Sequence, residues 1–519
     1  MKRWSVISLM IFAACSTATQ GGQQLPTGQS LSPLVTPGAR FDALVTHVGP
    51  HPDYVADGAA AMVVSPDRRQ MLLMTSGFNR YNGADGKVVS NQSQQYILLY
   101  AIDARGSRLR QTLRVPNSYS GIAWLPDGSG FVVGGGVDDV VHRFARRGSA
   151  FAEIAPPITL GHKTGNGAAV KPQAAGIAVS ADGRRAIVAN YYNDSVSLID
   201  LAGGSVLAEQ DLRPGKIDSA NIGKPGGEFP FAVAWTSAGE AWVSTPRDRQ
   251  LVGLSISADT LKVTRRIATI GEPTALLHDR TAHRLYATED NADRLAVVDL
   301  ATGRLIAEPR LGFPAALGAE PVRKGLNPNA IAQAHDGRLL VTLGGVNALA
   351  VVVPTGAELA VTALVPTGWY PSAVATSADG RRVFVANRKS PPGPNPAGCA
   401  PKLAIYRGQP NACGAANQYI FQLEKSGLLQ FPMPTERQLS RTTLQVADNV
   451  GLLRNADRVA AEARMAAVRA RIKHVIFIVK ENRTYDQCSA TSKLATATPN
   501  WRSSGRVCRP ITTSWLASS

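Results

Sequence analysis

The chain has 519 residues, enough for several domains or for one large repeat fold. Its 48 glycines and 33 prolines, with only 18% charged residues, favour many short strands and turns over a helical fold. The formal net charge of +17 is compatible with an anionic partner or with an arginine-rich surface. Because no dense basic run is present, the sequence argues against a nucleic-acid partner.

The first residues have the pattern of an export signal. Lys2 and Arg3 form a basic start, residues 6–14 form a short apolar stretch, and small residues follow. This stretch is shorter than a membrane-spanning helix requires. We therefore predict a signal peptide over residues 1–18 and an exported protein. No later stretch is long and apolar enough for a transmembrane span.

The end of this signal allows two kinds of processing. The segment from Phe12 to Ser16 resembles a bacterial lipobox, in which Cys15 is lipidated, although Phe12 stands where leucine is usual. Cleavage near Ala18 is the alternative. The protein is then either periplasmic or an outer-membrane lipoprotein whose membrane attachment is the lipid on Cys15. Residues 19–40 are rich in Gln, Gly, Pro, Ser and Thr, which predicts a flexible tether.

A repeated strand–turn–strand unit dominates the next 400 residues. The clearest copy runs from Gly176 to Asn190 and turns at Asp182-Gly183, and the alternating segment 196–201 follows it as a third strand. Asp-Gly between two apolar runs predicts a hairpin, since both turn residues tolerate a positive φ.

Six further copies complete the series, with turns spaced at roughly 40–60 residues. The seven copies are Ala61–Thr75, Ile122–Val133, Gly176–Asn190, Ala232–Ser244, Thr274–Thr288, Ala330–Thr342 and Ala373–Asn387. A unit of about four strands at this spacing is typical of a β-propeller, whose blades bury their faces by closing a ring. We predict an all-β, seven-bladed propeller over residues 41–450.

The repeat also resembles a known family. Ile187-Val188-Ala189-Asn190-Tyr191, followed by the strand 195–200, looks like the YVTN repeat of YncE-like seven-bladed propellers, and Val385-Ala386-Asn387 echoes it. The resemblance covers roughly residues 41–424. It implies a WD40-like architecture and no particular activity, because propellers carry many functions.

Four prolines mark candidate ligand contacts. Phe229, Glu272, Asn327 and Tyr370 each precede a proline at the start of a first strand. Loops from all blades converge at the mouth of a propeller channel, so we expect these four side chains to line one mouth. Their ligand would be a small molecule or a cell-envelope component. The alternative is that proline only sets the start of the strand, with its neighbour packed or capping.

Cysteines and histidines offer few further sites. Cys399 and Cys413 flank a Pro/Gly-rich insertion and are predicted to form a disulfide in an oxidising compartment, with unpaired thiols as the alternative. His47 and His51, with Asp53, could in principle bind a metal ion. The sequence has no HxH or CxxC pattern to support that site.

The composition changes after the last repeat. Residues 455–471 are Ala-rich with helical spacing, and residues 472–480 form an apolar run typical of a buried parallel strand. This run leads into the segment from Glu481 to Gln487. A helix followed by such a strand predicts the start of an α/β domain over residues 451–487.

The segment 472–487 strongly resembles the opening of the phosphoesterase family in the alkaline phosphatase superfamily, which includes bacterial phospholipases C and acid phosphatases. Proteins that join a YncE-like propeller to this domain form a bifunctional type. The resemblance implies that Glu481 and Asn482 are ligands of a divalent metal ion. The metal would help a Ser or Thr nucleophile attack a phosphate ester.

The rest of that family pattern is not found in residues 488–519, which contain 12 Ser or Thr and neither Asp nor Glu. We interpret this segment as an aberrant, disordered tail that follows a frameshift after Gln487. The expected product is a monomeric binding propeller fused to an incomplete phosphoesterase domain. No catalytic residue is assigned, no metal is expected to bind, and phosphate-ester hydrolysis remains the alternative function.

Overall fold

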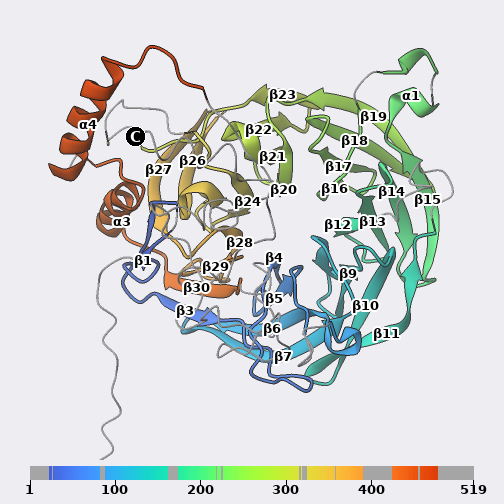
Figure 1. Ribbon diagram of the computed structural model, residues 1–519. Coiled ribbons are helices and arrows are strands. Elements are labelled where there is room, and N and C mark those ends of the chain that lie inside the picture. The colour runs from blue at the N-terminus through green and yellow to red at the C-terminus, as the bar shows by residue number, and fades with distance from the viewer. Residues whose placement is uncertain are drawn as a thin grey trace, which may run out of the picture. The chain divides into compact units, whose positions relative to one another are not determined.

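The computed structural model describes residues 23–476 except 26, 82–87, 162–172, 218, 224–225, 315–316, 318–323, 357, 390–423 and 454–455. The chain forms two compact units, Met1–Leu453 and Arg454–Ser519. The described residues of the first unit form seven four-stranded antiparallel sheets, which are the blades of a propeller (Figure 1). The predicted all-β, seven-bladed fold is confirmed.

Each blade is a meander that runs from an innermost to an outermost strand. Blades 1 and 2 are β4 (Ala59–Val64), β5 (Gln70–Thr75), β6 (Gln95–Asp103), β7 (Gly106–Val115), and β8 (Ile122–Trp124), β9 (Gly130–Gly134), β10 (Val140–Arg147), β11 (Ala150–Thr159). Blades 3 and 4 are β12 (Ala174–Val179), β13 (Arg185–Asn190), β14 (Ser195–Asp200), β15 (Ser205–Asp211), and β16 (Val233–Ser237), β17 (Glu240–Thr245), β18 (Gln250–Ser257), β19 (Thr260–Ala268). Blades 5 and 6 are β20 (Pro273–Asp279), β21 (Arg284–Glu289), β22 (Arg294–Asp299), β23 (Arg304–Ala307), and β24 (Pro328–Gln333), β25 (Leu339–Leu343), β26 (Ala348–Thr355), β27 (Glu358–Pro366). Blade 7 is β28 (Pro371–Thr376), β29 (Arg382–Asn387), β30 (Gly427–Pro432) and, from the N-terminal part of the chain, β3 (Arg40–Ala43).

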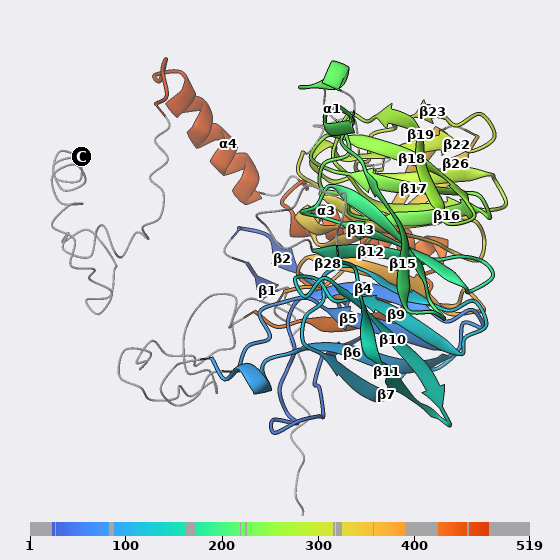
Figure 2. The same cartoon turned by 90° about the vertical axis from the view of Figure 1, so that its right-hand side faces the viewer.

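The innermost strands form a closed ring, in which β4, β8, β12, β16, β20, β24 and β28 each contact the next and β28 contacts β4. The seven repeats seen in the sequence are the first two strands of the seven blades. Segments that lead into the innermost strands lie on one face of the ring, which we call the lead-in face. The hairpin turns between the first and second strands lie on the other, the turn face. Figure 2 shows the ring from the side, with the short strands β1 (Gln23–Gln24) and β2 (Ser30–Leu31) on the lead-in face.

The ring closes through a strand pair between distant parts of the chain. β3 pairs antiparallel with β30, with Phe41 opposite Leu429. The buried amide of Gln430 donates from Nε2 to Asp42 Oδ2 at 2.9 Å and to Ser107 Oγ at 3.0 Å, which ties the seam to blade 1. The sequence did not indicate this closure.

Apolar layers fill the spaces between adjacent blades. One buried cluster joins Trp242 and Leu251 of blade 4 to Leu285 and Val298 of blade 5. A larger cluster joins blade 5 to blade 6. Because an isolated blade would leave these side chains in water, burial between neighbours is the main force that holds the ring together.

The Asp-Gly turns use a positive φ at only one of the two residues that tolerate it. In the turn at Ser180–Arg185 only Gly183 has a positive φ, of 73°. Asp182 instead accepts hydrogen bonds from the Ser180 hydroxyl at 2.6 Å and the Arg184 N–H at 3.1 Å. A short acidic side chain that bonds to the backbone two residues on stabilises the turn locally, so Asp and Gly have separate roles.

Residues 23–40, predicted as part of a tether, contain a β1–β2 pair and buried side chains. Leu25 and Leu31 are 5% and 2% exposed. The Gln29 side chain donates to the Gly345 carbonyl at 3.0 Å and accepts from Asn347 at 2.7 Å. These contacts hold the segment on blade 6. A composition rich in small and polar residues did not reveal two buried leucines and one bidentate glutamine.

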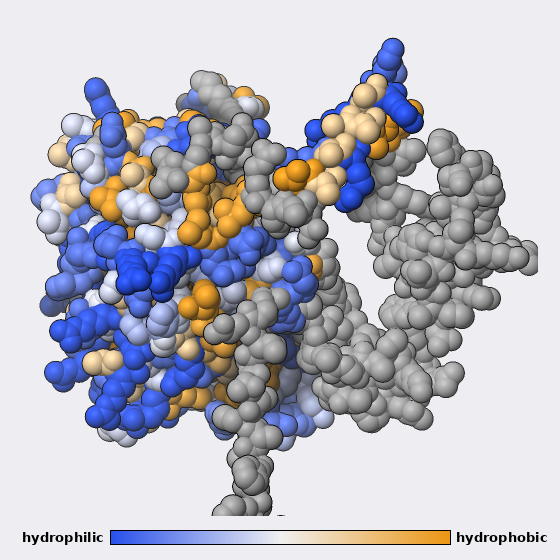
Figure 3. Space-filling model, turned by 90° about the vertical axis from the view of Figure 1, so that its left-hand side faces the viewer, coloured by the Kyte–Doolittle hydropathy of each residue, from blue (hydrophilic) through white to orange (hydrophobic). Residues whose placement is uncertain are grey.

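Two helices follow the propeller strands. In the first unit, α3 (Glu436–Asn449) begins with a capping box between Thr435 and Gln438 and packs on β27, where the Thr443 hydroxyl accepts the Leu364 N–H at 2.9 Å. Near β1, β2 and α3, apolar side chains form small patches among hydrophilic ones (Figure 3). The second unit contains α4 (Ala456–Arg469), which matches the predicted Ala-rich helix. Among the described residues, no helix is long and apolar enough to cross a membrane.

Candidate functional site

The lead-in face carries unusual backbone conformations. Phe229, Asn327 and Tyr370 have φ values of 57°, 53° and 55°. Asparagine tolerates this left-handed region, whereas bulky aromatic residues rarely adopt it. Each of the three precedes a proline, and each side chain is half-buried. Their prolines mark these residues in the sequence, and the structure adds the strained backbone.

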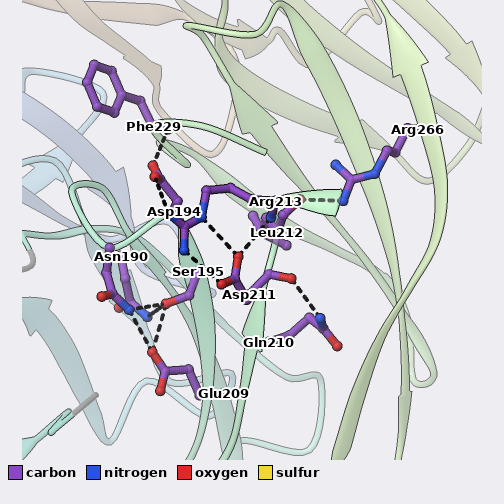
Figure 4. Close-up of polar contacts among 11 residues, drawn as sticks. Asn190, Asp194, Ser195, Glu209, Gln210, Asp211, Leu212, Arg213, Phe229 and Arg266 are labelled. Carbon is purple, nitrogen blue, oxygen red and sulfur yellow. Dashed lines mark hydrogen bonds and ion pairs between the residues drawn. The ribbon is translucent and has the colours of Figure 1, made fainter. Parts of the chain in front are cut away.

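Side chains of the preceding blade hold these backbones in place. Asp194 Oδ1 accepts the Phe229 N–H at 3.1 Å (Figure 4), and Asn347 Oδ1 accepts the Tyr370 N–H at 2.9 Å. Asp293 accepts N–H groups from Gly325, Leu326 and Asn327, at 2.9, 2.7 and 3.2 Å. Each holding residue lies between the second and third strands of its blade, so one blade positions the next.

Asp194 belongs to a small ionic group at the edge of blade 3. Arg213 lies 3.7 Å from its Oδ2 and 2.9 Å from Asp211, so one guanidinium serves two carboxylates (Figure 4). Burial raises the pKa of Asp194 to about 6, although the Phe229 N–H and Arg213 act in the opposite direction. The single positive charge of Arg213 is shared by two acids, and all three groups have partners within the protein, which suits a structural support.

Five aromatic rings gather on the lead-in side of blades 2 to 4. Tyr191 stacks on Phe229 with centroids 4.7 Å apart, and Tyr119 meets Tyr191 edge-on at 5.4 Å. Phe231 and Tyr192 extend the group, with Tyr119–Phe231 and Tyr192–Phe229 separations of 5.7 and 5.9 Å. Tyr192 is 42% exposed. This aromatic group offers ring faces and edges to a ligand.

Acidic groups lie on the lead-in face at blade 5, next to blade 4. The Asn291 side chain accepts the Glu272 N–H at 2.8 Å, and Asp290 Oδ1 accepts from Asn327 Nδ2 at 2.9 Å. Burial raises the pKa of Asp290, the Asn327 hydrogen bond opposes that shift, and the charge of Glu272 adds to it. Burial also raises the pKa of Tyr191, and Glu272 acts in the same direction. Glu272 therefore lies near both the aromatic group and Asp290.

Arg388 of blade 7 also lies on the lead-in face of the propeller. It follows β29 and donates one guanidinium N–H to the Ser76 carbonyl of blade 1 at 3.1 Å. Burial raises the pKa of Tyr119 and of Tyr370, and the positive charge of Arg388 offsets part of that rise at both residues. Arg388 is thus close to phenols of blades 2 and 7. Asp57, only 3% exposed, is also near, and burial raises its pKa to about 7 against the effects of Lys425 and Arg388.

Ring contacts, hydrogen bonds and the effects of charges on neighbouring pKa values together define what we call the mouth site, a set of residues around the propeller ring on the lead-in face. Its members are Tyr119, Tyr191, Phe229, Glu272, Asp290, Asn327, Tyr370 and Arg388. The four residues singled out in the sequence are all members, and none is fully buried. That they contact a ligand stays a prediction.

The other members lacked a proline signal but occupy repeat-equivalent positions. Tyr191, Asp290 and Arg388 each follow the second strand of a blade, and their N–H groups bond to the carbonyls of Gln173, Glu272 and Tyr370. Aligning the seven repeats on the end of the second strand would have found them.

A hollow of about 470 Å³ lies away from the mouth site, at the ring closure. Arg40, Asp42 and Tyr100 are among its lining residues. Arg40 Nε bonds to Asp42 at 2.8 Å, and Arg40 also donates to the Ser107 carbonyl at 3.0 Å. Arg40 and Asp42 pair within β3, and the bond from Arg40 to Ser107 links that strand to blade 1, so their evident role is closure.

Several predicted sites lie outside the described residues, namely Cys15, Cys399, Cys413, Glu481 and Asn482. Within the described ranges, no group of three or more His, Cys, Asp or Glu residues could hold a metal ion. His47, His51 and Asp53 therefore form no such group. His51 stacks on Tyr81 with centroids 3.7 Å apart and bonds to Gln92 at 2.9 Å.

Comparisons with known proteins support the fold and no closer relationship. No family model matches the chain, and no curated protein matches it. The crystal structure of RRP9 WD40 repeats superposes with a TM-score of 0.50 at 10% identity, covering 76% of this chain and 98% of that one. The structure of U3-55K gives 0.49 at 11% over 76% and 98%, and Kuenenia stuttgartiensis hydrazine synthase gives 0.46 at 16% over 64% and 93%. The protein is a seven-bladed β-propeller with a WD40-like fold.

Proposed function

We propose that the propeller is a binding module that takes a small ring-containing ligand at the mouth site. The observation that carries this proposal is the left-handed backbone at Phe229 and Tyr370. Glycine adopts that conformation freely, whereas other residues bear a cost of about 1–2 kcal/mol. Strained residues held by their surroundings are concentrated at functional sites. Two aromatic side chains kept at such positions, half-exposed on one face, are best explained by use of their rings.

The chemistry of the mouth site favours a ligand with both a ring and polar groups. The aromatic group supplies surfaces that can stack on the flat face of a sugar or an aromatic ring. Glu272, Asp290 and Arg388 supply charged groups around it. Binding pockets typically combine aromatic lining with a few placed polar groups in this way.

Glycine substitutions test the proposal without damaging the fold. Phe229→Gly and Tyr370→Gly remove the rings and relieve the backbone strain, so we expect thermal unfolding midpoints equal to or above that of the parent. Compounds selected by binding of the parent from a set of simple sugars, aromatic acids and aromatic alcohols should bind at least about tenfold more weakly to both variants.

Leu34→Ala is the control, because Leu34 is exposed on the segment before β3 and is not part of the mouth site. Its binding should equal that of the parent. Compounds that bind both glycine variants as well as the parent would contradict the proposal, as would a set in which nothing binds.

We also propose export, on the basis of residues 1–18. Mature protein is expected in the periplasm or at the outer membrane, and the mass of its N-terminal peptide distinguishes a lipidated Cys15 from cleavage near Ala18. We propose a monomer, which light scattering of the purified chain would test.

For the second unit, the resemblance of residues 472–487 to phosphoesterases rests on sequence alone. The expected lack of phosphatase activity and of a bound metal stays a prediction. Purified protein should not turn over p-nitrophenyl phosphate with added Mg²⁺, Mn²⁺, Zn²⁺ or Ca²⁺, and turnover would contradict it.

A further inference from the structure

We propose that the ligand of the mouth site carries an anionic group, a carboxylate or a phosphate, that binds Arg388. The inference rests on the proposed function, since it names the chemistry of the ligand at the same site. It assigns Arg388 as the residue that determines specificity for that group.

Arg388 is fixed in position, but not all of its N–H donors have a partner. Its backbone N–H bonds to the Tyr370 carbonyl at 2.9 Å, which places it beside a mouth-site residue. A guanidinium has five N–H donors in a planar fork. Among the described residues, the guanidinium of Arg388 donates a hydrogen bond to the Ser76 carbonyl, and no carboxylate oxygen lies within 4.0 Å of its nitrogen atoms.

Two other arginines on the lead-in face already pair with carboxylates. Arg213 pairs with Asp211 at 2.9 Å, and Arg247 pairs with Glu228 at 3.2 Å while lying over the Phe229 ring at 5.0 Å. Both guanidinium groups are thus paired with carboxylates of the protein itself. Arg388 differs from these two arginines because no carboxylate pairs with it, so several of its donors are left for a ligand.

The surroundings of Arg388 do not cancel its charge. Asp57 is the nearby acid, and because burial raises its pKa to about 7, it holds a proton part of the time near neutral pH. Lys425 adds a positive charge on the same side and Glu424 a negative one, so these two charges offset each other and leave that of Arg388. Glu272 and Asp290 lie at the blade 5 part of the propeller ring, where Asp290 bonds to Asn327 and is also close enough to Tyr370 to raise the pKa of that phenol. The mouth site is thus divided into an aromatic, an acidic and a basic part.

Carboxylates and phosphates suit the basic part because they accept two parallel N–H bonds from one guanidinium. The ring of the ligand would then contact the aromatic group or the Tyr370 ring. A matched pair of probes separates the two contributions: benzoate and benzamide have nearly the same shape, but only benzoate is charged.

The experiment measures the binding of benzoate, benzamide and phenyl phosphate to the full chain by calorimetry or ligand-observed NMR. At least one anion should bind the parent about tenfold or more tightly than benzamide. Arg388→Gln should abolish that preference, and Arg388→Lys should retain part of it. Preference for benzoate identifies a carboxylate ligand, and preference for phenyl phosphate identifies a phosphate ester. Arg381→Gln is the matched control, because Arg381 is exposed on the turn face with Asp379 4.0 Å away.

Each outcome bears on one of the two proposals. Equal binding of benzamide and both anions would overturn the role of Arg388 and leave the binding function standing. A uniform loss of all three probes in Arg388→Gln would show that Arg388 only supports the fold, and thermal unfolding of each variant would reveal that loss of structure. Failure of all three probes to bind the parent would overturn both proposals.

Discussion

The two faces of the propeller are built from the same strands but treat their acidic groups in opposite ways. On the turn face, hydrogen bonds are the largest cause that lowers the carboxylate pKa values, at Asp67, Asp127, Asp182, Asp336 and Asp379. On the lead-in face, burial is the largest cause that raises them, to about 7 at Asp57, about 6 at Asp194 and about 8 at Glu289. Ionised acids stabilise the first face, and the second keeps acids where ionisation is unfavourable.

The backbone shows the same contrast. Four hairpin turns place glycine at the position that needs a positive φ: Gly128, Gly183, Gly337 and Gly380. Two other hairpin turns have Arg68 and His283 with a positive φ, whereas the lead-in segments place the aromatic residues Phe229 and Tyr370, and Asn327, in this region. The difference teaches that the turn face is arranged for stability, while the lead-in face keeps side chains that the fold alone would not select.

The largest expected effect comes from removing a support of the lead-in face. Asp293 is 3% exposed and accepts three backbone N–H groups. Asp293→Ala leaves these donors without partners, so we expect the free energy of unfolding to fall by roughly 3 kcal/mol. Asp336→Ala on the turn face, where the side chain is half exposed, should lower it by less than about 1 kcal/mol. Urea unfolding measures both, and equal losses would break the comparison.

The pH dependence gives the next test. Burial and then the Glu308 carboxyl raise the pKa of Glu289 from 4.5 to about 8, so the folded state holds a proton that the unfolded state releases. The free energy of unfolding therefore falls as pH rises from about 4.5 to about 8. The Glu289→Gln side chain cannot ionise, so the variant should show a smaller decline. Its free energy of unfolding relative to that of the parent should be highest at pH 8 and above. Parallel profiles for the two proteins would contradict the assignment.

A third test addresses the turn face. Gly337 has a φ of 85° and no atom within 4 Å of an added Cβ, so Gly337→Ala introduces backbone strain without a clash. We expect a loss of about 1–2 kcal/mol in the free energy of unfolding. Gly312→Ala also has free space around its Cβ but no positive φ, and it should leave stability nearly unchanged. A similar loss in both variants would show that φ is not the cause.

The smallest expected effect is a gain. Phe229→Gly should leave the free energy of unfolding unchanged or raise it by up to about 1 kcal/mol, because relief of strain offsets the lost ring contacts. Phe229→Ala keeps the strain and loses the ring, so it should be less stable than Phe229→Gly. Thermal unfolding of the pair checks the order, and the reverse order would show that the ring contributes mainly to the fold.

The sequence was sufficient to predict the repeats but only some residues of the mouth site. Apolar alternation and turn residues set each blade, so the seven hairpins could be predicted in place. The proline neighbours led to Phe229 and Tyr370, and the end of the second strand marks Arg388, whereas Tyr119 carries neither signal and comes near Arg388 only when the ring closes. The closing strand β3 was missed because four residues between Pro/Gly-rich stretches show no period, and its pairing with β30 is a long-range contact.

The β3–β30 pair has a consequence for the order of events in folding. Asp42 and Gln430 are 388 positions apart, so the last blade needs both ends of the propeller sequence at once. Earlier blades can form from neighbouring segments, but the ring stays open until residue 432 is available. Contacts of such separation slow folding, and an open ring exposes strand edges to other chains. Aggregation during synthesis should therefore decrease when this one strand pair can form, making ring closure the step that commits the chain to its native state.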